Sequence, residues 1–379
     1  MASTISIYLC SRKQIDMKEL TSKTINWLRM ALVILVLFVH VHPDHNPHWL
    51  AMDHLAGQSL GWVAFSVIGT LINKLGFIAV PLFFAISGYL FFQKLEAWSW
   101  SVWKQKLRSR VRTLLVPYLI FNAICVISLL ACGFKVPYLG WLWNSVSFCQ
   151  GWENWLGMSM QLWYPQDVPL WFVRDLMVMV LLSPAIHWLI RKGGIVYLGT
   201  VGVLYCLGIL CCTPGFSTNA LFFFSLGAFA AIRRIEPVEW SSRNIRFLLP
   251  LFMVLWVVAS CIVAPGKAQP FENMMFIVGI PVLCCLVAGG LNRSYIREVP
   301  ILTASGFFVY AVHMVNWGRW SLLGSAGRFG VMVFNLDTPL GAAFGYLTEI
   351  VYILAIGVGV YWLLKRFAPG LQRILTGGR

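Results

Sequence analysis

The sequence predicts an all-α polytopic membrane protein: a transmembrane helix bundle of about ten spans, with both termini in the cytoplasm. Of its 379 residues, 59% are hydrophobic and 11% are charged, whereas about a quarter of the residues of a soluble domain are charged. Several apolar runs approach the roughly 20 residues that a helix needs to cross hydrocarbon. Lysine and arginine are concentrated in alternate connections between these runs, which is typical of membrane proteins.

Ten apolar segments, separated by polar or basic connections, are assigned as spans. The expected spans are Trp27–Val41, Leu75–Phe92, Thr113–Cys132, Val168–Ile190, Gly194–Cys212, Asn219–Ile232, Phe247–Val263, Phe271–Gly290, Ile301–Asn316 and Leu340–Leu364. The apolar stretch Gly61–Ile72 is too short to cross, so we expect it to lie at the surface or to re-enter the membrane. Residues 27–364 are therefore predicted to form one transmembrane domain.

The two ends of the chain are expected to be cytoplasmic tails. Residues 1–26 lack the basic start, apolar stretch and small-residue cleavage site of a secretory signal. Residues 365–379 form a basic C-terminal segment. If the spans alternate in direction, 23 of the 29 lysines and arginines fall on one side, five fall on the other and Arg174 lies within a span. Because excess Lys and Arg marks cytoplasmic connections, the net charge of +15 indicates topology rather than nucleic-acid binding.

Ionisable side chains at membrane depth are the first candidates for a functional site, because they are costly to place there. They are His40, Arg174, Asp175, His313 and Glu349. The direction of each span places all five in the outer half of the bilayer. Arg174 and Asp175 also fit a structural ion pair between helices.

Arginines at the cytoplasmic ends of the first and third spans form a second group of candidate functional residues. Arg29 opens the first span, and Arg108, Arg110 and Arg112 close the longest basic loop. Guanidinium groups bind phosphate through paired hydrogen bonds. Arg29 and His40 are eleven positions apart, which is about 16 Å along a helix. A long ligand with phosphates at one end and a reactive group at the other fits this spacing, as coenzyme A thioesters do. The alternative is that these arginines only anchor the topology.

No metal site or bound cofactor is expected. The ten cysteines show neither a CxxC pair nor the Cys/His spacing of a zinc site. His42, His45 and His48 recur every three residues, but Pro43 and Pro47 interrupt any helical face that they would share.

Five motifs occur in order at the positions that the topology assigns to them. They are Arg29-x10-His40, Val80–Leu90, Lys106–Arg112 leading into Pro117–Tyr118, Pro169–Leu176 followed by Leu182–Pro184, and Phe307–His313. Together they resemble the acyltransferase 3 family of membrane proteins, from about Thr24 to the end of the sequence.

The resemblance implies that the protein transfers an acyl group, usually acetyl from acetyl-CoA, to a hydroxyl of an extracytoplasmic or lipid-linked glycan. The expected partners are acyl-CoA as co-substrate, the glycan acceptor, membrane lipids and envelope-glycan assembly proteins. The expected location is the bacterial inner membrane.

Within that family reaction, histidine suits the role of general base because its pKa lies near working pH. We assign His40 as this base, with Asp175 or Glu349 holding its tautomer. Arg174 or His313 would stabilise the oxyanion. A covalent acyl-histidine route stays open.

Two other classes of function also fit the sequence. A transporter or flippase-like protein for a lipid-linked sugar or a small anion would explain the intramembrane charges, although no paired half-repeat is evident. A non-catalytic glycan-binding or assembly protein would explain the tryptophans of the outer connections. Dependence on coenzyme A distinguishes the acyltransferase from both.

Overall fold

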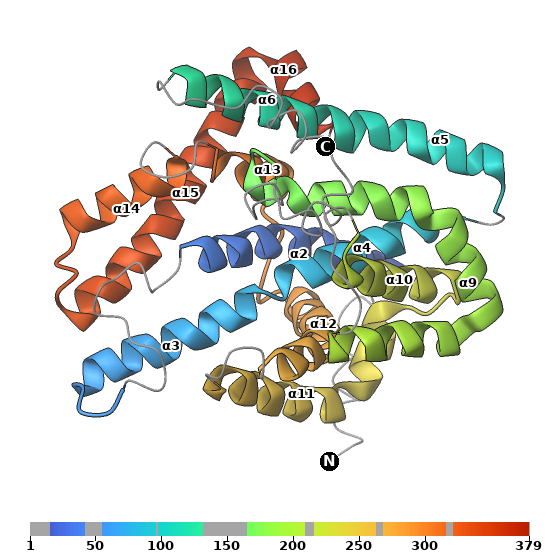
Figure 1. The fold of residues 1–379 in the computed structure, drawn as a ribbon, viewed down its shortest axis with the longest axis horizontal. Helices are drawn as coiled ribbons and strands as arrows, with labels where there is room; N and C mark the ends of the chain where they lie inside the picture. Colours follow the sequence, from blue (N-terminus) through green and yellow to red (C-terminus); the bar gives the residue numbers. More distant parts are fainter. Residues whose placement is uncertain are drawn as a thin grey trace, which may run out of the picture.

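The computed structural model describes residues 16–41, 55–95, 98–131, 165–208, 216–262, 268–315 and 321–378, and within them it is a helical bundle without strands (Figure 1). Seven helical segments are long and apolar enough to cross a membrane, and three shorter apolar helices accompany them. The prediction of an all-α membrane protein is therefore confirmed. The number of crossings and the cytoplasmic placement of both termini remain predictions.

The described elements follow one another along the chain in this order: α2 (Met17–His40), α3 (Leu60–Gly76), α4 (Ala79–Phe92), α5 (Trp100–Arg110), the π-helical turn Val111–Leu115, α6 (Val116–Ala131), the 3-10 turn Val168–Leu170, α9 (Trp171–Leu207), α10 (Thr218–Ile232), α11 (Pro237–Cys261), α12 (Gln269–Asn292), α13 (Pro300–Val312), α14 (Leu322–Val333), α15 (Pro339–Phe367) and α16 (Pro369–Thr376).

Helix α2 begins ten residues before the predicted first span. The side chain of Asp16 accepts a hydrogen bond from the backbone N–H of Lys18 and so caps the helix. Leu20 is buried in a small cluster with Val238 and Ala288. Residues 17–26, expected as tail, are thus the first turns of α2, because capping and packing extend the helix beyond its apolar part.

The short apolar stretch before the second span belongs to a longer helical segment. Helix α3 ends at Gly76, and α4 begins at Ala79 after a two-residue turn. Together they form one candidate span, Leu60–Phe92. The sequence placed the start of that span at Leu75, which lies inside α3.

Helix α9 is kinked at Gly194, where the backbone has φ 53° and ψ −129°. Positive φ is accessible to glycine without steric cost. The kink separates two arms that correspond to the predicted spans Val168–Ile190 and Gly194–Cys212, of which residues 209–212 lie outside the described residues. Figure 1 shows α9 turning back on itself at this point.

Helices α4 and α10 cross at two glycines. A Cβ atom added to Gly227 would lie 1.9 Å from the carbonyl oxygen of Ala85, and one added to Gly88 would lie 2.1 Å from that of Phe224. Small residues allow the backbones of membrane helices to approach this closely. Gly88 therefore has the packing role that its place in the motif allowed.

Replacing Gly227 with alanine is expected to destabilise the protein strongly, because the contacted atom is backbone and cannot rotate away. Overpacking costs about 1–3 kcal/mol or more. Gly289→Ala in α12 is the matched control, since no atom lies within 4 Å of its added Cβ. Thermal unfolding in detergent, followed by size-exclusion chromatography, measures both variants. Equal midpoints for the two would contradict the proposed close approach.

The C-terminal segment folds back onto the bundle. Lys365 and Arg366 form the last turn of α15, and α16 buries Gln372, Leu375 and Thr376. Figure 1 shows α16 beside α6. Residues 365–376, expected as a basic tail, are therefore helical and partly buried.

Candidate active site

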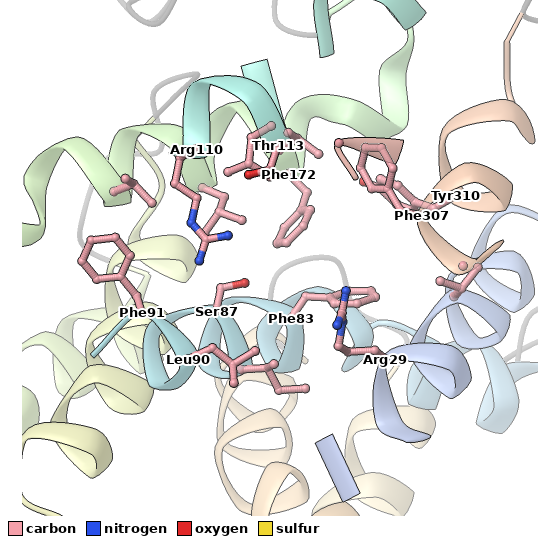
Figure 2. Close-up of a pocket in the computed structure, with 18 of the residues that line it drawn as sticks. Arg29, Phe83, Ser87, Leu90, Phe91, Arg110, Thr113, Phe172, Phe307 and Tyr310 are labelled. Atoms are coloured by element: carbon pink, nitrogen blue, oxygen red, sulfur yellow. The ribbon is translucent and has the colours of Figure 1, made fainter. Parts of the chain in front are cut away.

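A cavity of about 320 Å³ lies among α2, α4, α9 and α13, and residues of both arginine motifs line it. Figure 2 shows Arg29 from α2 and Arg110 from α5 reaching into it, with the hydroxyl of Ser87 between them. Most other lining side chains are apolar, and they include Val33, Phe83, Phe91, Phe172, Leu176 and Phe307.

Both guanidinium groups in this cavity are half-buried. In the part of the chain that the structure describes, neither forms an ion pair with a carboxylate, since the ion pairs found there join other residues. Two cations that share an otherwise apolar cavity favour an anionic ligand, and guanidinium favours phosphate or carboxylate.

Helical spacing explains why only some arginines of the basic motif reach this cavity. Arg108 and Arg112 are four positions apart and share one helix face, whereas Arg110 lies on the opposite face. The π-helical turn Val111–Leu115 follows Arg110 directly. Arg108 and Arg112 are exposed and line a neighbouring cavity of about 590 Å³. The four arginines predicted to bind phosphate are thus divided two and two between adjoining cavities.

Two histidines that are 273 positions apart in the sequence meet in the structure. Nε2 of His313 lies 3.2 Å from Nδ1 of His40, and the ring centroids are 4.9 Å apart. His40 is the last residue of α2, and its Nδ1 is also 3.1 Å from the carbonyl oxygen of Val36. His313 follows the end of α13, is fully buried and has its Nδ1 2.7 Å from the carbonyl oxygen of Tyr310.

These hydrogen bonds define the tautomers of both neutral rings. A carbonyl oxygen can only accept, so Nδ1 of His313 carries its hydrogen and Nε2 is an acceptor. Nδ1 of His40 faces two acceptors, Val36 O and His313 Nε2, and must therefore carry a hydrogen. Nε2 of His40 is then unprotonated and available to take a proton.

The cavity and the histidine pair are connected along two helices. On α2 the lining runs from Arg29 to Val33, and His40 lies seven positions further on, about 10 Å along the axis. On α13 the lining runs up to Tyr310, one turn before His313. Neither histidine lines the cavity itself, but both lie on or directly after helices that do.

Arg174 and Asp175 form a buried ion pair near the start of α9. Nε and Nη2 of Arg174 both lie 3.3 Å from Oδ1 of Asp175. The pair is within one helix, rather than between helices, and it directly follows the cavity-lining residues Phe172 and Val173.

Neither Asp175 nor Glu349, the carboxylates considered as partners of His40, hydrogen-bonds to it among the described residues. Among the described residues, the hydrogen bonds of His40 go to Val36 and His313. The carboxylate of Glu349 lies against Gly327 and Gly330 of α14.

Asp167 is a buried residue that directly precedes the predicted span Val168–Ile190. Its backbone N–H donates to Oδ1 of Asn122 at 3.2 Å, but neither carboxylate oxygen has a hydrogen-bond partner among the described residues. Burial raises the pKa of the Asp167 carboxyl well above its usual range. It lies two positions before Pro169, whose carbonyl oxygen accepts from the Tyr310 hydroxyl. In the sequence, Asp167 could have been noticed as an acidic residue directly before an apolar span that begins with Val168 and Pro169.

A larger cavity of about 1020 Å³ is lined by other residues at the end of α4. It contains Lys94, Arg191 and Arg234, and the ring of His187 stacks on Trp98 at 4.8 Å. None of its lining residues belongs to α13, the helix that precedes His313.

Within the described ranges, no group of three or more His, Cys, Asp or Glu side chains could hold a metal ion. His42, His45 and His48 lie outside the described residues.

Comparisons with known proteins identify relatives of the chain. Residues 22–371 match a family model described as an acyltransferase domain. The succinoglycan biosynthesis protein ExoH of Rhizobium meliloti (strain 1021) is 27% identical over 375 residues, covering 94% of this chain and 92% of that protein. No solved structure gives a significant match.

Proposed function

This chain belongs to the acyltransferase 3 family of integral membrane proteins, and from that premise we propose that it transfers an acyl group from cytoplasmic acyl-CoA to a glycan hydroxyl. Acetyl-CoA is the donor that we propose first. The acceptor is an extracytoplasmic or lipid-linked glycan, and the location is the bacterial inner membrane. Similarity to a succinoglycan biosynthesis protein supports a role in polysaccharide synthesis, alongside envelope-glycan assembly proteins.

The hydrogen bond between His40 and His313 carries this proposal. The acceptor hydroxyl attacks the thioester carbonyl while Nε2 of His40 takes its proton. The tetrahedral intermediate then expels the thiolate of coenzyme A, which receives that proton from His40. Nδ1–H of His40 donates to His313 throughout, so the ring keeps its orientation as its charge changes.

This geometry favours a positioning role for His313 over the oxyanion role. In the neutral ring, its only N–H donates to the carbonyl oxygen of Tyr310, and Nε2 is an acceptor. Arg174 is then the proposed oxyanion stabiliser, with Asp175 holding its guanidinium.

The cytoplasmic half of the cavity suits the donor. Arg29 and Arg110 would hold phosphate groups, and the apolar lining would surround the pantetheine chain that leads toward the histidines. Water excluded from such a lining cannot compete with the acceptor for the thioester.

Transfer of radiolabelled acetyl groups tests the proposal. Purified protein in nanodiscs is given labelled acetyl-CoA and a lipid-linked oligosaccharide extract, and binding of acetyl-CoA is measured with free phosphate and pantetheine as competitors. Saturable binding with label in the glycan is the expected result. A folded sample that binds no acetyl-CoA up to millimolar concentration would exclude the proposal and favour the transporter or flippase-like reading.

A further inference from the structure

The last described residues of the chain form a wall of the donor cavity. Gly377 and Gly378 line it together with Thr113, and the same three residues line the neighbouring cavity of about 590 Å³. A Cβ atom added to Gly377 would lie 2.5 Å from the carbonyl oxygen of Thr113, so the backbone of the glycine pair packs directly on the π-helical turn. The two cavities therefore adjoin at this point.

This wall is held in place by helix α16. Gln372 is buried and donates hydrogen bonds to the hydroxyls of Tyr361 and Thr376 at 3.2 and 3.1 Å. Gly377 has φ 66°, and the N–H of Gly378 donates to the carbonyl oxygen of Arg373 at 2.7 Å, which closes the helix with a left-handed cap. The glycine pair is thus fixed by the fold.

The second cavity is basic. Arg108 and Arg112 line it from the end of α5 and the π-helical turn, and Arg373 lines it from α16. Arg373 uses Nε to donate to the carbonyl oxygen of Pro369 at 3.3 Å. Among the described residues none of the three forms an ion pair, and no aspartate or glutamate lines either cavity.

Two adjoining cavities with separate sets of guanidinium groups fit one ligand that carries anionic groups at two positions. Coenzyme A has this chemistry, because its diphosphate and its ribose 3′-phosphate are separate groups. An acyl group carried on protein-bound phosphopantetheine has a single phosphodiester.

We propose that Arg373, with Arg108 and Arg112, forms a subsite for the ribose 3′-phosphate of the donor, next to the Arg29 and Arg110 subsite for its diphosphate. This inference rests on the proposed function and identifies a part of the donor that the enzyme recognises.

The test compares acetyl-CoA with 3′-dephospho-acetyl-CoA, using full-length protein in nanodiscs. For the wild-type protein, loss of the 3′-phosphate is expected to weaken binding about tenfold to a hundredfold, as for other hydrogen bonds to charged groups. Arg373→Gln is expected to lower the affinity for acetyl-CoA to near the affinity for the dephospho compound. The affinity of this variant for the dephospho compound should equal that of the wild-type protein. Arg366→Gln is the matched control, because Arg366 is exposed at the end of α15 and lines neither cavity.

Equal affinity of the wild-type protein for the two donors would overturn the subsite and leave the acyltransferase proposal intact. An equal loss for both donors in Arg373→Gln would also overturn it, because the arginine would then act without the 3′-phosphate. Absence of binding for both donors to the folded wild-type protein would overturn the subsite together with the proposed function. Unfolding midpoints of the variants establish that each sample is folded.

Discussion

His40→Gln is expected to lower the turnover number for acyl transfer by about a thousandfold, because a positioned general base contributes about 10²–10⁴-fold. Glutamine retains a side-chain hydrogen-bonding group at the end of α2 but cannot take the proton of the acceptor hydroxyl. The affinity for acetyl-CoA should change little, since His40 lies beyond the arginines that are proposed to hold the phosphates. Turnover of labelled acetyl-CoA and equilibrium binding separate these two effects.

His187→Gln is the matched control for this variant. His187 stacks on Trp98 in the larger cavity, away from the proposed reaction, and its replacement should leave turnover unchanged. Retained turnover in His40→Gln would remove His40 as the base.

His313 provides a separate test of the histidine pair. His313→Ala is expected to lower turnover because Nδ1–H of His40 loses its acceptor. His313→Gln should restore part of the activity, since the Gln oxygen can accept that hydrogen bond. A merely structural role would give the same turnover for both variants at equal unfolding midpoints.

Arg29→Gln and Arg110→Gln are each expected to weaken acetyl-CoA binding about tenfold to a hundredfold. A hydrogen bond to a charged group contributes about 1.5–3 kcal/mol, and about 1.4 kcal/mol corresponds to tenfold in affinity. Turnover at saturating donor should be largely retained, because the hydrogen bonds of His40 and His313 involve neither arginine. Isothermal titration measures the affinity, and the labelled-acetyl assay measures turnover.

Arg246→Gln is the control for charge alone. Arg246 is an exposed arginine on α11 whose guanidinium lies over the ring of Phe247, outside both donor cavities. If all three variants bind acetyl-CoA as the wild-type protein does, Arg29 and Arg110 serve only to anchor the topology.

The helical membrane fold could be predicted from the sequence because its signals are local. Apolar runs of sufficient length form spans, since a backbone in hydrocarbon must satisfy its own hydrogen bonds. The sequence predicted a break between two spans at Arg191–Gly194, and the structure places the kink of α9 at Gly194. Span boundaries were less accurate where capping or packing extended a helix, as at Asp16 and Met17.

The candidate site could be predicted in part. Arg29 and His40 share one helix, so the helical rise alone sets their separation along its axis. The helical period groups Arg108 with Arg112 and places Arg110 on the opposite face. Which of these two faces lines the cavity could not be predicted, because it depends on how α5 packs against the other helices.

The sequence by itself therefore determined the all-α membrane class and the family to which the chain belongs. Only the tertiary structure brought His313 to His40 and folded α16 back to place Arg373 beside Arg112. The physical reason is that spacing along one helix is local geometry. A contact between helices hundreds of residues apart depends on which faces pack together, as at Gly88 and Gly227, and the whole bundle decides that.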